Sequence, residues 1–425
     1  MTHKRPINAD SPATAPGAEK EEARPRTPIP VALKAIAGLA VLGVAFLLAA
    51  ILGGSGQGSS QGGSPPSNDR EAGSSAESTP GAPSNNTTRI EGEDAASIGA
   101  SVALAVYPSR TPAQRPGAVT LVGETWQDAV ASAVLMAAPI RAPLLLADAG
   151  GPLPPGDQAL AMLQPKGITL EKAGNRSRDG GQAYAIGPVA TPALDSKRTG
   201  DTVGAAQAAE IEALRDSLFR GAPRHVVVAP EDNAAFAMPA AAWAARSGDP
   251  VLYARADKLP APTAAALRAH PKVPVYVLGP TSAISPAVMR EIAGIVKRVK
   301  RVSGKTPAEN AVALARYADG SFGWNVNDPG HGFVIVRAGA PLNAALAAPL
   351  SASGTWGPLL LTENAEKLPK ATREYLLDVK PGYTTDPTRA FYNHVWIIGG
   401  EDEIDANQQA EINQLAELTK VGGQR

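Results

Sequence analysis

A threefold internal repeat constrains the fold of this chain more than any other feature of its 425 residues. Each of three segments contains an apolar stretch, a stretch of small residues, and a second apolar stretch that opens with a proline, namely Pro143, Pro250 and Pro358. These prolines are 107 and 108 residues apart. Each lies 19 residues after the end of the first apolar stretch, at Glu124, Glu231 and Gly339. Such constant spacing predicts three copies of one folding unit.

The three copies share further motifs in the same order. A third apolar stretch ends in a glycine turn, at Gly187, Gly279 and Gly399. Each turn is followed by a residue of a type that caps helices, namely Thr191, Ser285 and Asp405. Each copy also opens with a short segment that holds a basic residue and a glycine, and we interpret this segment as the start of a helix; the segments are 89–92, 197–200 and 301–304.

These patterns predict an α/β fold. The apolar stretches are nearly continuous, which is typical of parallel strands that helices cover on both faces. Each copy is expected to run helix–strand–helix–strand–helix–strand–helix. The chain should therefore contain three tandem parallel-sheet (Rossmann-like) modules, at residues 89–196, 197–300 and 301–419.

An uncharged apolar stretch precedes the repeats. Residues 35–52 include ten Leu, Ile, Val or Phe residues, and as a helix they would span about 27 Å, close to the thickness of a bilayer core. A cleaved signal peptide is the alternative, but the long polar stretch before it favours a retained signal anchor. Six cations precede the stretch and the first cation after it is Arg70, so the positive-inside rule places the N-terminus in the cytoplasm.

We therefore expect one transmembrane helix ahead of the modules. It should occupy residues 31–52, after a disordered cytoplasmic tail at residues 1–30 and before a flexible linker at residues 53–88. The repeats should then lie outside the cell membrane, facing the cell wall. The 40 Lys and Arg residues balance the 40 Asp and Glu residues, which argues against nucleic acid as a partner, and the absence of cysteine excludes disulfides.

The order of motifs resembles the type-2 cell-wall-binding repeat family over about residues 89–419. Residues 128–134 read DAVASAV, like the family's small-residue helix, and residues 279–285 and 399–405 read GPTSAIS and GGEDEID, like its glycine turn. Two features depart from the pattern: the counterparts of Asp128 are Ala235 and Asn343, and the first turn is two residues shorter. The resemblance implies a bacterial envelope protein with a pseudo-threefold arrangement of modules and noncovalent binding to an anionic wall polymer.

No motif of this sequence indicates catalysis, a cofactor or a metal. Residues 303–306 read SGKT, but the earlier glycine of a phosphate loop would fall at Val299. No two of the five histidines share the helical spacing of metal ligands. We therefore predict no catalytic residue, metal or cofactor. An enzyme remains an alternative if polar side chains converge in one pocket from the non-repeated insertions, which are residues 165–182, 319–332 and 381–393.

Two recurring sets of residues are the candidates for ligand binding. The glycine turns should lie at the carboxyl ends of parallel strands, where helix N-termini present N–H groups to anions; they contribute Gly187, Gly279, Gly399 and Ser285. Ordinary helix capping is the alternative there. The opening segments contribute Arg89, Arg198 and Arg301, which could pair with phosphate or carboxylate or form intermodule salt bridges.

The function expected from the sequence is noncatalytic. A membrane-anchored protein would bind anionic cell-wall polymer through its three repeats. The first alternative is an envelope scaffold that binds a protein partner or regulates a wall enzyme. The second alternative is the enzyme with its site in the insertions.

Overall fold

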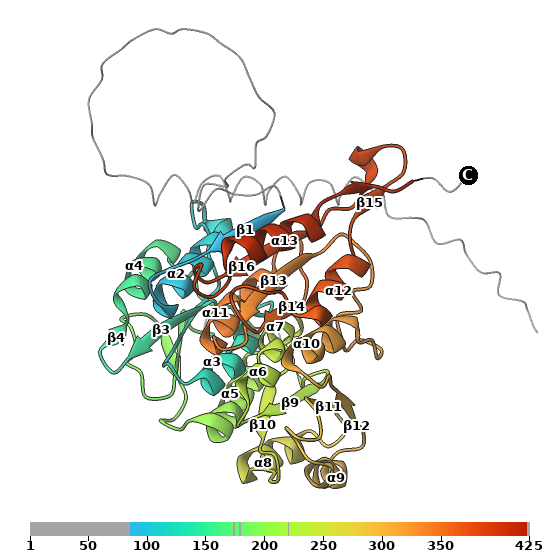
Figure 1. The fold of residues 1–425 in the computed structure, drawn as a ribbon. Coiled ribbons are helices and arrows are strands. Elements are labelled where there is room, and N and C mark those ends of the chain that lie inside the picture. Colours follow the sequence, from blue (N-terminus) through green and yellow to red (C-terminus); the bar gives the residue numbers. More distant parts are fainter. Residues whose placement is uncertain (1–85, 173–174, 178–179, 220, 423–425) are drawn as a thin grey trace, which may run out of the picture.

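The computed structural model describes residues 86–172, 175–177, 180–219 and 221–422 (Figure 1). The cytoplasmic tail, the transmembrane helix and all but the last three residues of the linker that the sequence predicts lie outside this part of the chain. Within the described residues, no helix has both the length and the apolar character needed to cross a bilayer.

Three mostly parallel sheets form the framework, which confirms the α/β class. The first contains β4 (Gly151–Pro152), β3 (Leu144–Asp148), β2 (Val119–Val122), β7 (Ala183–Ile186) and β8 (Ser196–Arg198), in that order. The second contains β10 (Val251–Ala254), β9 (Val226–Pro230), β11 (Val275–Leu278) and β12 (Val299–Val302). The third contains β14 (Leu359–Thr362), β13 (Gly332–Arg337), β16 (His394–Ile398) and β1 (Thr87–Ile90).

The last strand of each sheet corrects the predicted order of elements. The opening segments of the repeats are not helix starts: they form the edge strands β8, β12 and β1. Each pairs with the third strand of the preceding repeat, and β1 pairs in parallel with β16 of the last repeat, as the blue and red strands of Figure 1 show. The sequence concealed these strands because edge strands carry charged residues instead of an apolar run.

Helices of equivalent position cover the sheets. The edge strands lead into α2 (Ala95–Val106), α5 (Gly204–Leu218) and α10 (Pro307–Arg316). The first strands lead into α3 (Trp126–Ser132) with η2 (Ala133–Met136), into α6 (Ala234–Ala237) with α7 (Pro239–Ser247), and into α11 (Pro341–Ala352). The second strands lead into α4 (Pro154–Leu163), α8 (Ala261–Ala269) and α12 (Lys370–Asp378).

The helix expected after the third strand forms in only two repeats. These are α9 (Pro286–Ile295) and α13 (Ala406–Ala416). In the first repeat only residues 187–195 separate β7 from β8, whereas residues 279–298 separate β11 from β12. Thr191 therefore begins no helix, because too few residues follow it before the chain must enter the edge strand. The shorter elements are η1 (Pro112–Gln114), β5 (Leu170–Lys172), β6 (Asn175–Ser177), β15 (Gly382–Tyr383), η3 (Pro387–Arg389) and β17 (Thr419–Lys420).

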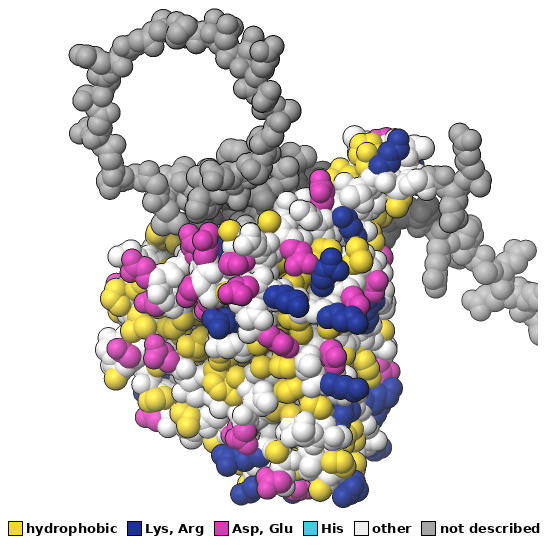
Figure 2. Space-filling model, in the orientation of Figure 1, with side chains coloured by type: hydrophobic (Ala, Val, Ile, Leu, Met, Phe, Trp, Pro, Cys, Tyr) yellow, Lys and Arg dark blue, Asp and Glu magenta, His cyan; other side chains and the backbone are white. Residues whose placement is uncertain are grey.

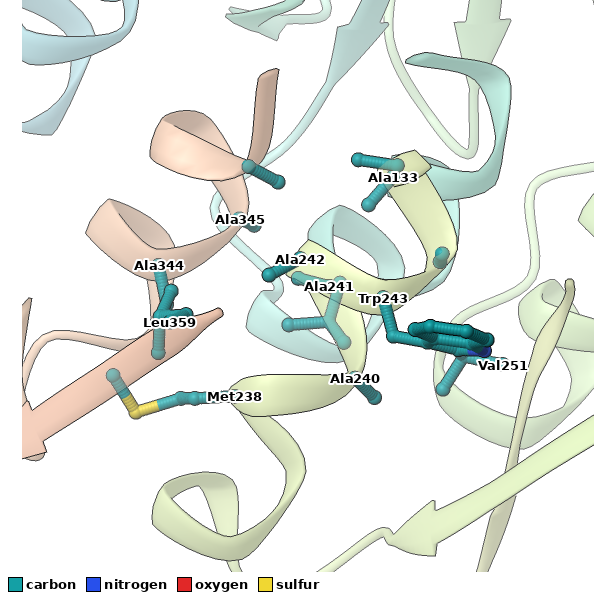
Figure 3. Close-up of a cluster of buried hydrophobic side chains, with 14 of the residues drawn as sticks. Ala133, Met238, Ala240, Ala241, Ala242, Trp243, Val251, Ala344, Ala345 and Leu359 are labelled. Atoms are coloured by element: carbon teal, nitrogen blue, oxygen red, sulfur yellow. The ribbon is translucent and has the colours of Figure 1, made fainter. Parts of the chain in front are cut away.

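Small-residue helices meet at the centre of the molecule. Helix α7 contacts η2 and α11, and α11 also contacts α2 and α3. Their facing residues are mostly fully buried alanines, including Ala242 of α7 and Ala345 of α11 (Figure 3). Without long side chains between them, the helix backbones can approach closely and pack densely. One continuous cluster of buried apolar side chains consequently extends through all three repeats.

A buried carboxylate joins the first repeat to the second. Asp128 of α3 is 3% exposed, and its Oδ1 accepts the N–H of Gly204, 2.8 Å away, at the first residue of α5. Glu231, which follows β9, accepts the next N–H, that of Ala205, at 3.1 Å. The N-terminus of α5 is thus satisfied by side chains of two different repeats.

The central packing predicts a large penalty for added volume. Ala242→Leu should lower the free energy of unfolding by about 1–3 kcal/mol, because the surrounding helices cannot separate without losing contacts. Ala265→Leu, on the exposed side of α8, is the matched control and should change it by less than about 0.5 kcal/mol. Urea unfolding followed by circular dichroism measures both. Equal effects of the two substitutions would contradict this account of the core.

Asp128 predicts a pH dependence of stability. Burial raises the pKa of Asp128 from 3.8 to about 7, although the Gly204 N–H opposes the rise. Between about pH 4 and 7 the folded protein therefore holds a proton that the unfolded chain has lost, so the free energy of unfolding falls as the pH rises through this window. Asp128→Asn keeps the Oδ1 acceptor without the charge.

We expect Asp128→Asn to be more stable than the wild type at pH 8 and nearly equal to it at pH 4. Urea unfolding at the two pH values measures the difference, and Asp257→Asn, at an exposed loop position, serves as the control. A stability difference for Asp128→Asn that does not change with pH would be inconsistent with a raised pKa.

Candidate functional site

The glycine turns lie where the sequence placed them, at the carboxyl ends of the third strands. Gly187, Gly279 and Gly399 have φ values of +75°, +95° and +112°, a region that favours glycine. Ser285 caps α9 by accepting the Val288 N–H at 3.3 Å. Asp405 caps α13 by accepting the Gln408 N–H at 2.7 Å. Both side chains thus make the capping bonds that were the alternative to ligand binding.

Two of the predicted arginines hold these turns closed. Arg301 on β12 donates to the carbonyl oxygens of Gly279 (2.6 Å), Pro280 (3.2 Å) and Ile284 (2.7 Å). Arg89 on β1 makes the equivalent bonds to the carbonyls of Gly399 (2.8 Å) and Ile404 (2.7 Å), and also to the Gln409 side chain. We call each arginine with its turn an arginine clasp. Within the described residues, both arginines donate to carbonyl and amide oxygens, so they make these bonds in place of the intermodule salt bridge that was the alternative.

Arg198 occupies the same position without a clasp. It lies opposite Ala185 in the ladder, as Arg301 lies opposite Val277 and Arg89 opposite Ile397. Because the first repeat has no helix after its turn, Arg198 instead contacts Asp201 and the Thr199 carbonyl. Its side chain is 49% exposed. Arg198 is thus the most exposed of the three arginines.

The clasps predict a difference in stability among the three arginines. Arg89→Ala and Arg301→Ala should each lower the free energy of unfolding by about 1–3 kcal/mol, because each leaves partly buried carbonyls without donors. Arg198→Ala, which is the matched control, should cost less than about 0.5 kcal/mol. Chemical unfolding of the three variants provides the measurement. Equal small effects would mean that the clasps do not support the fold.

A hollow in the described structure lies at the opposite, amino-terminal ends of the strands. We call it the aromatic pocket. It has a volume of about 290 Å³ and is lined by Arg224, His225, Trp243, Arg246, Ser247, Asp249, Ser321, Gly323, Trp324 and Trp356. The sequence motifs pointed to the carboxyl ends of the strands, so this site was not predicted.

Residues of two repeats form the aromatic pocket. His225 directly precedes β9, and Asp249 lies between α7 and β10. Ser321 belongs to the insertion 319–332 of the third repeat, at the tip of a tight turn closed by the backbones of Asp319 and Phe322. The buried Phe322 ring stacks on Tyr276, with centroids 3.6 Å apart and planes inclined by 2°. This stacking fixes the turn against the second sheet and places Ser321 beside His225.

Three polar side chains form a hydrogen-bonded series in this pocket. Ser321 Oγ lies 3.2 Å from His225 Nε2, and His225 Nδ1 lies 3.0 Å from Asp249 Oδ2. Asp249, which is 2% exposed, also accepts the Trp243 indole N–H at 3.0 Å and the His225 backbone N–H at 3.1 Å. A carboxylate at Nδ1 holds the proton on that nitrogen, so Nε2 is the acceptor that faces the hydroxyl.

Flat aromatic faces and cations form the rest of the wall. The Arg246 guanidinium lies over the Trp356 ring, 4.5 Å from its centroid. Trp324 stacks near Trp356, with centroids 6.1 Å apart and planes inclined by 23°. Arg224 adds a second exposed cation at the rim. The combination of ring faces with guanidinium groups suits a ligand that has both apolar faces and negative charge.

A second hollow occupies the corresponding place in the first repeat. It has a volume of about 640 Å³ and is lined by Gly117, Ala138, Pro139, Arg141, Lys166, Gly167, Ile168 and Thr169. Each hollow is formed by the start of a first strand, the end of a central helix and an insertion. The insertion of the second hollow belongs to the same repeat, whereas that of the aromatic pocket belongs to the third repeat. The second hollow has two cations but no aromatic wall, so only the aromatic pocket combines both features.

One cluster of side chains in the described residues has the composition of a metal site. Glu212 and Asp216 on α5 lie 3.0 Å and 2.7 Å from His270 Nε2. Arg215 also contacts Asp216, at 2.7 Å, so the cluster already contains a balancing cation. Burial raises the pKa of Glu212 to about 7. Because this cluster contains one histidine, the spacing of histidine pairs in the sequence gives no sign of it.

The sequence contained two signals for the aromatic pocket. Three of the five tryptophans line it, and one of the insertions considered for an enzyme supplies Ser321. Neither signal showed that residues from different repeats would meet. His225 and Asp249 also share no motif that marks them as partners, because 23 residues separate them in sequence.

Comparisons with known proteins show what the fold resembles. No family model matches the chain, and no curated protein matches it either. Among solved structures, Cwp8 from Clostridium difficile matches with a TM-score of 0.56 and 19% identity, over 78% of this chain and 52% of that one. Cwp6 from the same organism matches with a TM-score of 0.60 and 17% identity, over 79% of this chain and 48% of that one. The chain thus spans about half the length of each, and the likeness is one of fold.

Proposed function

We propose that this protein is a binding component of the bacterial cell envelope and that its three repeats hold an anionic cell-wall polymer noncovalently. The observation that carries the proposal is the fold shared with Cwp8 and Cwp6 over more than three quarters of the chain. The repeated motifs of the sequence, which resemble the type-2 cell-wall-binding family, point the same way. In this proposal the three modules form a pseudo-threefold unit, and residues 31–52 tether it to the membrane.

The aromatic pocket is the proposed contact for the polymer. A sugar ring can contact the aromatic wall formed by Trp324 and Trp356, and a phosphate or carboxylate can pair with Arg246 or Arg224. Basic and acidic side chains are interspersed over the face shown in Figure 2. Attraction of an anion must therefore come from local cations such as Arg246 and Arg224. Ligand-binding pockets elsewhere combine an apolar wall with a few placed polar groups in the same way.

The predicted ligand residues have unequal places in this proposal. Arg89, Arg301, Gly279, Gly399 and Ser285 are engaged in the clasps and caps, which leaves few of their polar groups for a polymer. Arg198 and the neighbouring Gly187 turn have no clasp between them. They are proposed as a secondary contact for the polymer.

Sedimentation with purified cell walls tests this function. The full chain, kept in a mild detergent, should be retained on walls and released as salt rises, because screening weakens charge-assisted contacts. Arg246→Ala and Trp356→Ala should each reduce retention about tenfold, as expected for the loss of about 1.4 kcal/mol of binding free energy. Arg268→Ala, an exposed arginine on α8, is the control and should bind like the wild type.

Walls stripped of anionic polymer provide the decisive comparison. Retention should fall to the background level on such walls. Equal retention with and without the polymer would contradict the proposal and would favour a protein partner in the envelope instead.

A further inference from the structure

The series Ser321–His225–Asp249 has the order of groups found in serine nucleophile sites. The hydroxyl faces the acceptor nitrogen of an imidazole, and a buried carboxylate holds the opposite nitrogen. Ser321 is exposed at the mouth of the aromatic pocket, whereas Asp249 is buried behind His225. In the described structure His225 is the one hydrogen-bond partner of the Ser321 hydroxyl.

The other repeats show that the fold does not require this series. At the equivalent positions in the strand register, His225 is replaced by Ala118 in the first repeat and by Gly332 in the third. Asp249 is likewise replaced by Ala142 and Gly357. The same strand and helix ends form with small apolar residues at these positions, so the construction of a module does not require the His–Asp pair.

We propose that Ser321 is a nucleophile, activated by His225 and positioned through Asp249, that hydrolyses a carboxylic ester on an anionic sugar polymer. The choice of polymer rests on the proposed function, but the nucleophile does not. The cavity of about 290 Å³ takes a small acyl group, and Arg224 and Arg246 at its wall take the negative charge of the carrier. The proposed hydrolysis adds an activity to the binding surface. Its nucleophile belongs to the insertion 319–332, one of the three insertions that the sequence offered as a possible enzyme site.

The reaction proceeds in two balanced steps. Ser321 Oγ forms a bond to the ester carbonyl carbon while His225 Nε2 takes the hydroxyl proton. The bond from that carbon to the sugar oxygen then breaks, and the alcohol leaves with the proton from His225. Water next attacks the acyl carbon and gives a proton to His225, which returns it to Ser321 Oγ as the carboxylic acid leaves.

Residues of the same wall carry the candidate donors for the oxyanion. The backbone N–H groups of Gly323 and Trp324 make no hydrogen bond within the described residues, and both residues line the pocket. Gly323 has a φ of +97°, so this turn depends on glycine. The Arg246 guanidinium is a further donor. Stabilisation of a tetrahedral oxyanion by such groups is a major contribution to acyl transfer.

Labelling with a fluorophosphonate–rhodamine probe tests the nucleophile. The purified full chain should take up one probe per molecule, and peptide mass spectrometry should place it on Ser321. It should also hydrolyse p-nitrophenyl acetate. Ser321→Ala should lose the label and at least about 100-fold of the esterase rate. Ser303→Ala, at an exposed position outside the pocket, should keep both.

Two further measurements separate this role from a structural one. Asp249→Asn should slow labelling and change its pH profile, because the imidazole loses the carboxylate that holds its tautomer. Ser321→Ala should keep the thermal stability of the wild type, since it removes only one exposed hydroxyl. Absence of labelling in the wild type, or equal labelling of Ser321→Ala, would overturn the nucleophile. If the wild type is labelled at Ser321 but does not bind cell walls, the polymer is wrong as the substrate, whereas the assignment of Ser321 as a nucleophile is unaffected.

Discussion

Close packing of small-residue helices at the centre is the constraint on which the rest of the structure depends. Helix α7 lies against η2 and α11, and fully buried alanines such as Ala242 and Ala345 form the contacts. Dispersion contacts are weak singly, but many of them act together when backbones approach closely. This packing fixes how the three sheets are placed relative to one another. The edge strands, the glycine turns and the pocket at the strand ends take their positions from that placement.

The edge strands turn this central contact into a closed arrangement. Each repeat gives its opening strand to the sheet before it, and β1 completes the sheet of the last repeat. Arg89 and Arg301 then fasten two of these strands to the glycine turns beside them. Because the opening strand of each repeat is hydrogen-bonded into the sheet of another, the three repeats form a single structure, and one large apolar cluster extends through all of them. Their boundaries in sequence therefore differ from their boundaries in space.

The junction between the second and third repeats illustrates how such a structure gains a site. The sheets bring the start of β9, the end of α7 and the insertion 319–332 to one place. The insertion contributes the Phe322 ring, which stacks on Tyr276, and the Ser321 hydroxyl, which faces His225. Repeats that share one framework can differ at their junctions, since an insertion there can add its own buried side chains, such as Phe322 and Trp324, to the existing core. The aromatic pocket exists in one copy for this reason.

The sequence by itself determined the local elements, and the tertiary structure decided what those elements meet. Apolar runs and fixed prolines were enough to predict the inner strands, the small-residue helices and the glycine turns, since these follow from nearest neighbours along the chain. The partners of β1, β8 and β12 could not be predicted, because an edge strand with charged residues has no periodicity of its own. The contacts of Asp249 with Trp243 and His225 could not be predicted either. The same holds for the contact of His225 with Ser321, which lies 96 residues later in the chain. Those contacts depend on the angle at which the helices pack, and that angle is set by the whole core.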